Sequence, residues 1–191
     1  DMAAFGAVPG LTIAAPMNEP ELRNMMYTAL GSGHPFMIRY PRGHGEGLPW
    51  RGEKFETLPV GRGRRLREGA DVALLTVGTV GNAAARAAGR AAAEGVSVAH
   101  YDLRFVKPLD EALLDEVGRK FRRVVTVEDG SLRGGVGEAV AAFFNGRGYD
   151  VRVQRLGIGD EWVEHGTPGQ LYALCGYDEE GILRALLDTR A

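Results

Sequence analysis

The stretch LTIAAPMNEPELRNMMYTALGSGHPFMIRYPRG, residues 11–43, carries two apolar segments with a helical pattern between them. Leu11–Ala15 and Phe36–Tyr40 are short, apolar and bounded by proline and glycine, which predicts strands. Between them Asn18 is a favourable N-cap, and apolar residues recur every three or four positions until Gly31. A strand, a helix and a strand with short connections predict a parallel βαβ unit and therefore an α/β fold.

After this unit, a segment without a regular pattern precedes a second series of alternating strands and helices. Residues 44–59 are rich in glycine, proline and charge and have no sustained period, which predicts a linker. Beyond it we expect strands at 72–79, 96–103, 123–129 and 151–157, and helices at 80–94, 109–121, 137–145, 167–175 and 178–187. The predicted organisation is an α/β domain end at 1–43, the linker at 44–59, and a second α/β domain with a mostly parallel sheet at 60–191.

Composition excludes several classes of function. The formal net charge of -2 argues against nucleic acid and anionic membrane as partners. The basic run at 61–68 has no interleaved aromatic residues, so a solvated edge strand is the better interpretation. Cys175 is the single cysteine, no apolar run approaches the roughly 20 residues of a membrane helix, and no basic-then-apolar leader occurs. We expect a cytoplasmic protein without a disulfide framework.

Two arginines at the end of an apolar strand form the most informative motif. Pro41 cannot donate to a sheet, so Arg42 is expected just beyond the carboxyl end of a parallel strand, where α/β sheets bind ligands. A guanidinium matches phosphate geometry and stays charged. From the residues alone, a phosphate ligand and a salt bridge to a linker acid such as Glu46 remain equally open for Arg42. Arg39 is a weaker candidate for the phosphate site, because it points to the opposite face of the strand, which favours a buried structural ion pair.

Other polar residues are weaker candidates. Tyr40 and His44 flank the arginine motif and are secondary candidates for a phosphate site. The Gly-rich turn at 131–138 can hold an anion on backbone N–H groups, but a tight strand-to-helix turn is the better interpretation. Glu128 and Asp129 are expected to cap that turn or to face a partner subunit. The four histidines are not spaced as metal ligands, so we predict no metal site.

The motifs in order resemble one enzyme family. PMNEPELRNMMYTAL, PFMIRYPRG, YDLRFVKPLDEALLDEV, VVTVEDGSLRGGVGEAV and the tail GIGDEWVEHGTPGQLYALCGYDEEGI resemble the last third of 1-deoxy-D-xylulose-5-phosphate synthases, along nearly the whole chain. RYPRG and RFVKPLD are the most distinctive segments, and VEDGSLRGG is shared more broadly with transketolase-like domains. The resemblance implies the end of a thiamine-diphosphate pyrimidine-binding domain followed by a transketolase-like C-terminal domain.

The resemblance also implies an activity. Family members condense pyruvate with D-glyceraldehyde 3-phosphate, release carbon dioxide and feed isoprenoid, thiamine and pyridoxal biosynthesis. Thiamine diphosphate and Mg²⁺ are held by a GDG motif with a downstream asparagine, and a glutamate activates the cofactor. Neither the motif nor that glutamate has a counterpart here, so we expect no catalytic or cofactor-binding residue in this segment, and inactivity of the chain alone. The substrate-phosphate arginine of the family corresponds to Arg42. The implied partners are the upstream portion of the same enzyme and a second copy.

Two alternatives remain open at the level of sequence. A transketolase or the β-subunit of a 2-oxoacid dehydrogenase has the same architecture and cofactor, although RYPRG argues against both. Use of ketose donors or lipoamide distinguishes these enzymes. A non-catalytic α/β assembly module is the alternative of another class, which a buried salt bridge at Arg42 favours.

Overall fold

The computed structural model describes residues 1–52 and 54–188, so Glu53 of the predicted linker and residues 189–191 of the predicted second domain lie outside the described residues. The helices are α1 (Met2–Gly6), α2 (Glu19–Gly31), α3 (Val80–Ala93), α4 (Glu111–Lys120), α5 (Val136–Gly146), α6 (Pro168–Leu174) and α7 (Glu179–Leu187). The strands are β1 (Thr12–Ala14), β2 (Phe36–Ile38), β3 (Arg64–Arg67), β4 (Val72–Val77), β5 (Val98–Asp102), β6 (Phe105–Lys107), β7 (Arg123–Ser131) and β8 (Arg152–Ile158).

The strands form two sheets. The larger has the order β3-β5-β4-β7-β8, in which β3 is antiparallel to β5 and the remaining pairs are parallel. The mostly parallel sheet predicted from the alternation of strands and helices is thereby confirmed. The smaller sheet has the order β2-β1-β6, with β1 and β2 parallel as the βαβ pattern predicts.

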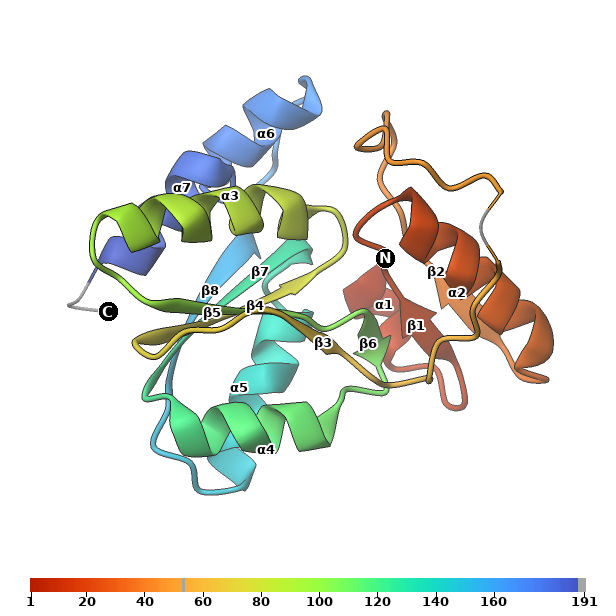
Figure 1. Ribbon diagram of the computed structural model, residues 1–191, viewed down its shortest axis with the longest axis horizontal. Helices are drawn as coiled ribbons and strands as arrows, with labels where there is room; N and C mark the ends of the chain where they lie inside the picture. The colour runs from red at the N-terminus through yellow and green to blue at the C-terminus, as the bar shows by residue number, and fades with distance from the viewer. Residues whose placement is uncertain (53, 189–191) are drawn as a thin grey trace.

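Helices cover both faces of the larger sheet (Figure 1). On one face α3 and α7 pack over an apolar cluster that includes Leu74 and Ile182; on the other α4 and α5 pack over a cluster that includes Leu114 and Phe144. The central strand β4 is buried at every position, because it contributes to both clusters. Strands covered on both faces are expected to be continuously apolar, as the sequence of β4 is.

The basic run predicted to be an edge strand forms one edge of the larger sheet. Residues 64–67 form β3, which pairs on one side with β5 and is mostly exposed. The solvated edge strand predicted for this run is confirmed. Arginine side chains suit such an edge, because charge opposes pairing with another chain.

Three local predictions are corrected. The short helix α1 was not expected, and neither was β6, which lies within the predicted second domain but pairs antiparallel with β1 of the first. β2 ends at Ile38 rather than Tyr40, although Arg39 N still donates to Ala14 O at 2.8 Å. β3 begins at Arg64 rather than at residue 61, and the remaining elements lie within two residues of their expected ends.

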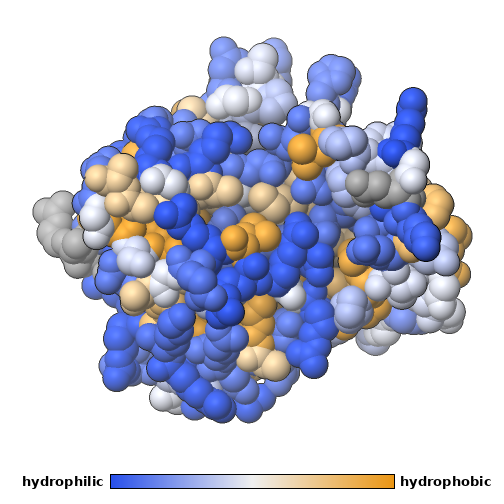
Figure 2. All heavy atoms as spheres, in the orientation of Figure 1, coloured by the Kyte–Doolittle hydropathy of each residue, from blue (hydrophilic) through white to orange (hydrophobic). Residues whose placement is uncertain are grey.

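Apolar surface is exposed around α2 and β2, on the right of Figure 2. Met26 and Leu30 of α2 are 56% and 89% exposed and, with Phe36 and Ile38, line a groove of about 380 Å³. None of the described helices is long and apolar enough to cross a membrane.

Candidate functional site

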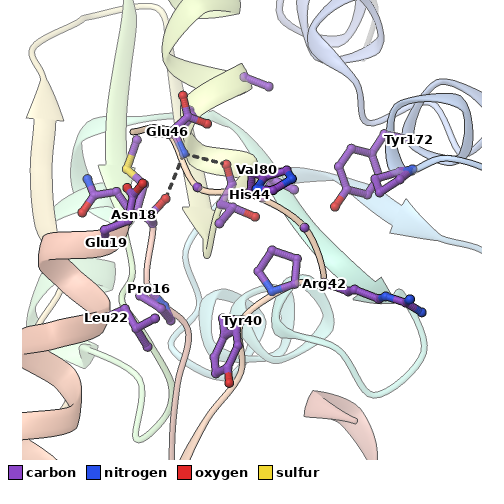
Figure 3. Close-up of a pocket in the computed structure, with 18 of the residues that line it drawn as sticks. Pro16, Asn18, Glu19, Leu22, Tyr40, Arg42, His44, Glu46, Val80 and Tyr172 are labelled. Atoms are coloured by element: carbon purple, nitrogen blue, oxygen red, sulfur yellow. Dashed lines mark hydrogen bonds between the residues drawn. The ribbon is translucent and has the colours of Figure 1, made fainter. Parts of the chain in front are cut away.

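A cavity of about 660 Å³ lies where the two sheets approach each other. Its walls come from the start of α2, the segment after β2, the start of α3 and the region of α6. Figure 3 shows Glu19 and Leu22 on one side and Tyr172 on the other, with His44 and Val80 between them. The side-chain amide of Asn82 donates to Met17 O at 2.8 Å and to Thr79 O at 3.1 Å, so α3 is tied to the segment before α2.

Arg42 lies on the wall of this cavity, four residues after the end of β2. Its side chain points away from Glu19 and Leu22, toward the side where Tyr172 lies (Figure 3). Arg42 is exposed and forms no ion pair with any residue that the structure describes, Glu46 included. The second arginine on the wall, Arg86, is paired with Glu179 at 2.8 Å. Arg42 is therefore available to an external anion.

Arg39 has a different environment. Its Nη2 lies 2.7 Å from Asp129 Oδ2, at the end of β7, and its Nε lies 3.7 Å from Asp1 Oδ2. The side chains of Arg39 and Asp129 are 17% and 12% exposed, so this is a largely buried ion pair between the two sheets. The pair expected from the direction of Arg39 exists, and its partner, 90 residues away, was not predicted.

Asp129 also holds two tyrosines of the cavity wall. The hydroxyl of Tyr177 donates to its Oδ1 at 2.9 Å, and that of Tyr172 to its Oδ2 at 3.3 Å. Burial and the adjacent carboxylate raise the pKa of both tyrosines, so both phenols stay protonated and can donate. Asp129 therefore ties the strand before Arg42 to the α6 side of the cavity, a role that sequence reasoning missed.

The secondary candidates Tyr40 and His44 both line the cavity and both are exposed. Tyr40 points away from Val80 in Figure 3. The structure thus brings Arg42, Tyr40 and His44 to one cavity and directs Arg39 to a structural pair.

Glu128 caps the Gly-rich turn, as the sequence predicts. Its two oxygens accept from Val136 N at 2.9 Å and Gly137 N at 2.8 Å, at the start of α5. Burial raises the pKa of this carboxyl, and the two N–H donors oppose that effect. A Cβ on Gly135 would lie 2.2 Å from Ser131 O, so the turn needs glycine there for packing.

A cluster of four charged side chains joins α2 to the larger sheet. Arg104 donates from Nε and Nη2 to the two oxygens of Glu21, both at 2.8 Å. Arg64 bridges Glu21 Oε1 at 3.0 Å and Asp102 Oδ2 at 3.1 Å. Burial raises the pKa of Asp102 to about 6, although Arg64 lowers it.

His100 is buried next to this cluster. Its Nε2 lies 2.9 Å from Thr76 Oγ1, and the residue is 1% exposed. Burial lowers the pKa of His100 to about 4, and the positive charges of Arg64 and Arg67 add to the effect. The imidazole is neutral and structural, as expected of a mid-strand histidine.

The described residues do not by themselves fit a Mg²⁺–diphosphate site. Over 1–52 and 54–188, no group of three or more His, Cys, Asp or Glu side chains is placed to hold a metal ion. Mg²⁺ prefers several oxygen ligands in octahedral geometry, usually one or two carboxylates with phosphate oxygens. The group in the cavity wall that can bind an anion is the guanidinium of Arg42.

Comparison with known proteins places this geometry in a family. The model of the transketolase C-terminal domain matches residues 61–182, which hold the whole larger sheet. The chain belongs to the transketolase C-terminal domain family. A solved transketolase described as "split gene transketolase, inactive beta4 tetramer" superposes with a TM-score of 0.84 at 28% identity, over 97% of this chain and 59% of that one. The α/β fold expected from the sequence is confirmed for this transketolase-like chain.

Relatives of higher identity carry a more specific name. The 1-deoxy-D-xylulose-5-phosphate synthases of Bacteroides fragilis and Bacteroides thetaiotaomicron are 53% and 52% identical over 100% and 98% of this chain. That of Symbiobacterium thermophilum is 43% identical over 95% of it. The chain spans about 30% of the length of these relatives. The resemblance deduced from RYPRG and RFVKPLD is confirmed, whereas the role of Arg42 stays a prediction.

Proposed function

We propose that this transketolase-family chain is the C-terminal part of a 1-deoxy-D-xylulose-5-phosphate synthase, and that Arg42 binds the phosphate of D-glyceraldehyde 3-phosphate. The observation that carries the proposal is the state of Arg42: exposed on the wall of a cavity, at the carboxyl side of a parallel strand, and unpaired among the described residues. The relatives of higher identity, which are named 1-deoxy-D-xylulose-5-phosphate synthase, supply the choice of enzyme.

The complete enzyme, in this proposal, is a cytoplasmic homodimer that uses thiamine diphosphate and Mg²⁺ to join pyruvate and the triose phosphate with loss of carbon dioxide. The cofactor supplies the carbanion chemistry, and the residues that hold it belong to the upstream portion. This chain contributes binding and orientation. Arg42 anchors the phosphate so that the aldehyde end of the substrate is presented in register.

Arg42→Ala in the complete enzyme tests the proposal. Removing one charge-assisted phosphate contact costs about 2 to 4 kcal/mol, which corresponds to a loss of roughly 30- to 1,000-fold in kcat/KM for D-glyceraldehyde 3-phosphate. The pyruvate KM and the kcat/KM for unphosphorylated D-glyceraldehyde are expected to stay within about twofold, because neither involves the phosphate.

Arg147→Ala is the matched control, since it removes an exposed arginine that pairs with Glu111 outside the cavity. An equal loss with phosphorylated and unphosphorylated aldehyde refutes a phosphate role for Arg42. Turnover with ketose donors or lipoamide in place of pyruvate and triose phosphate refutes the choice of enzyme.

A further inference from the structure

Among the residues that the structure describes, the segment that follows Arg42 is hydrogen-bonded to the body of the protein at one residue. Gly47 N donates to Glu19 Oε1 at 2.7 Å. Over the described ranges 1–52 and 54–188, the hydrogen bonds between residues 40–49 and the rest of the chain all end on Glu19. Arg39 N, bonded to Ala14 O, is the last attachment before this segment, and Trp50 O, bonded to Arg23, is the first after it.

Packing shows how closely the segment lies on this carboxylate. A Cβ on Gly45 would lie 2.3 Å from Glu19 Oε1 and 2.5 Å from its Cδ, so glycine lets the backbone rest on the side chain. Gly47 has a φ of +75°, a conformation that other residues adopt at a cost. The glycines of RGHGEG thus shape a loop that fits over Glu19, which is a reason for their presence that the linker prediction lacked.

Glu19 is also held in place itself. Asn18 caps α2 by accepting from Glu21 N at 3.1 Å, which sets the first turn and the carboxylate that projects from it. Backbone N–H groups of Glu19 itself, Gly47, Glu46 and Leu48 lower the pKa of Glu19, so the carboxylate is charged at neutral pH. A charged acceptor at a helix start, facing loop N–H groups, makes a directional tether.

We infer that Glu19 is a positioning residue that sets Arg42 for phosphate binding by tethering the loop after it. The inference rests on the proposed function of Arg42. The strand side of Arg42 is fixed by Arg39 and its ion pair with Asp129, and the loop side is fixed by Glu19. Without the tether the loop is free to leave the cavity wall, and the guanidinium is no longer held where the phosphate binds.

Glu19→Ala and Glu19→Gln, compared in the complete enzyme, test the inference. The alanine variant is expected to raise the KM for D-glyceraldehyde 3-phosphate about tenfold while kcat and the pyruvate KM change less than about twofold. The glutamine variant retains an oxygen that accepts from Gly47 N, so its KM is expected within about threefold of the wild type. Glu56→Ala, which removes an exposed carboxylate from the same 44–59 segment, is the control and leaves KM unchanged.

Trypsin cleavage of the Arg42–Gly43 bond gives a readout that does not depend on activity. Glu19→Ala is expected to speed the appearance of the fragment that begins at Gly43, measured by mass spectrometry, about tenfold over the wild type and Glu56→Ala, because a released loop enters the protease more readily. Unchanged cleavage and unchanged KM overturn the inference. So does an equal loss for all substrates together with a lowered melting temperature, which marks a role in folding.

The two proposals fail separately. If Arg42→Ala raises the triose-phosphate KM and Glu19→Ala does not, the tether is wrong and the phosphate site stands. If Arg42→Ala leaves that KM unchanged, the proposed function fails, and the positioning role that rests on it is overturned even where cleavage is faster.

Discussion

His100→Gln isolates the contribution of one buried imidazole to the pH dependence of folding. His100 is 1% exposed, and its side chain contacts Thr76 Oγ1 at 2.9 Å. Burial, with the charges of Arg64 and Arg67, lowers its pKa from 6.5 to about 4 in the folded chain. Because the folded pKa is below the unfolded value, the unfolded chain binds the proton more readily, and protonation favours unfolding.

The magnitude follows from the two pKa values. At pH 7 the imidazole is neutral in both states, so it adds no pH-dependent term. Between pH 6.5 and pH 4 the unfolded chain takes up the proton and the folded chain does not. At about 1.36 kcal/mol for each pKa unit, this lowers the free energy of unfolding by about 3 kcal/mol at pH 4.

Urea unfolding of the wild type and of His100→Gln at pH 7, 5.5 and 4 measures this term directly. The difference in unfolding free energy between them is expected to shift by about 3 kcal/mol in favour of the variant from pH 7 to pH 4, because other titrating groups cancel in the difference. His165→Gln, which removes an exposed imidazole, is the control. A difference for His100→Gln that is independent of pH refutes the argument, since the folded chain would then protonate His100 freely.

Two further substitutions test other parts of the structure. Asp102→Asn removes a carboxyl whose pKa is raised to about 6 in the folded chain, so the folded chain binds this proton more readily than the unfolded chain. As the pH rises from 4 to 7, the free energy of unfolding of the wild type is therefore expected to fall by about 2 to 3 kcal/mol relative to the variant, which is the reverse of the effect of His100. The same urea series measures this difference. Gly69→Ala places a Cβ 2.2 Å from Ala99 N and from Val98 C, so the backbone of β5 has to move. We expect the free energy of unfolding to fall by about 2 kcal/mol or more, measured by thermal unfolding. An unchanged melting temperature contradicts this packing.

The sequence predicts this fold well where periodicity is strong. β4 and α3 are long enough to show an apolar run and a helical repeat, and both lie close to the predicted ends. α1 has five residues and β6 has three, too few to display a period. β6 is set by its pairing with β1, a contact between segments far apart in the chain that no local pattern specifies.

In the candidate site, too, the sequence predicts the features that depend on local pattern and does not predict those that depend on contacts between distant segments. The place of Arg42 at the carboxyl side of a parallel strand follows from Pro41 and the βαβ rule, and the structure has it on a cavity wall. The partners of Arg39 come from β7 and the chain start, and the loop contact of Glu19 comes from the predicted linker. These contacts depend on tertiary packing. The residue types predict that Arg39 and Glu19 are charged and can pair, but they do not predict which residues are the partners.

The pairing of β6 with β1 holds the first residues of the chain to the rest of the protein independently of the peptide segment that connects them. Lys107 at the end of β6 also donates from Nζ to Gly6 O at 2.9 Å and Val8 O at 2.6 Å, so the chain start is fastened to the larger part by strand and side chain together. A peptide bond cut within 44–59 severs the polymer but none of these attachments. We therefore expect the two parts to stay associated after such a cut, because strand pairing and side-chain contacts join them independently of residues 44–59.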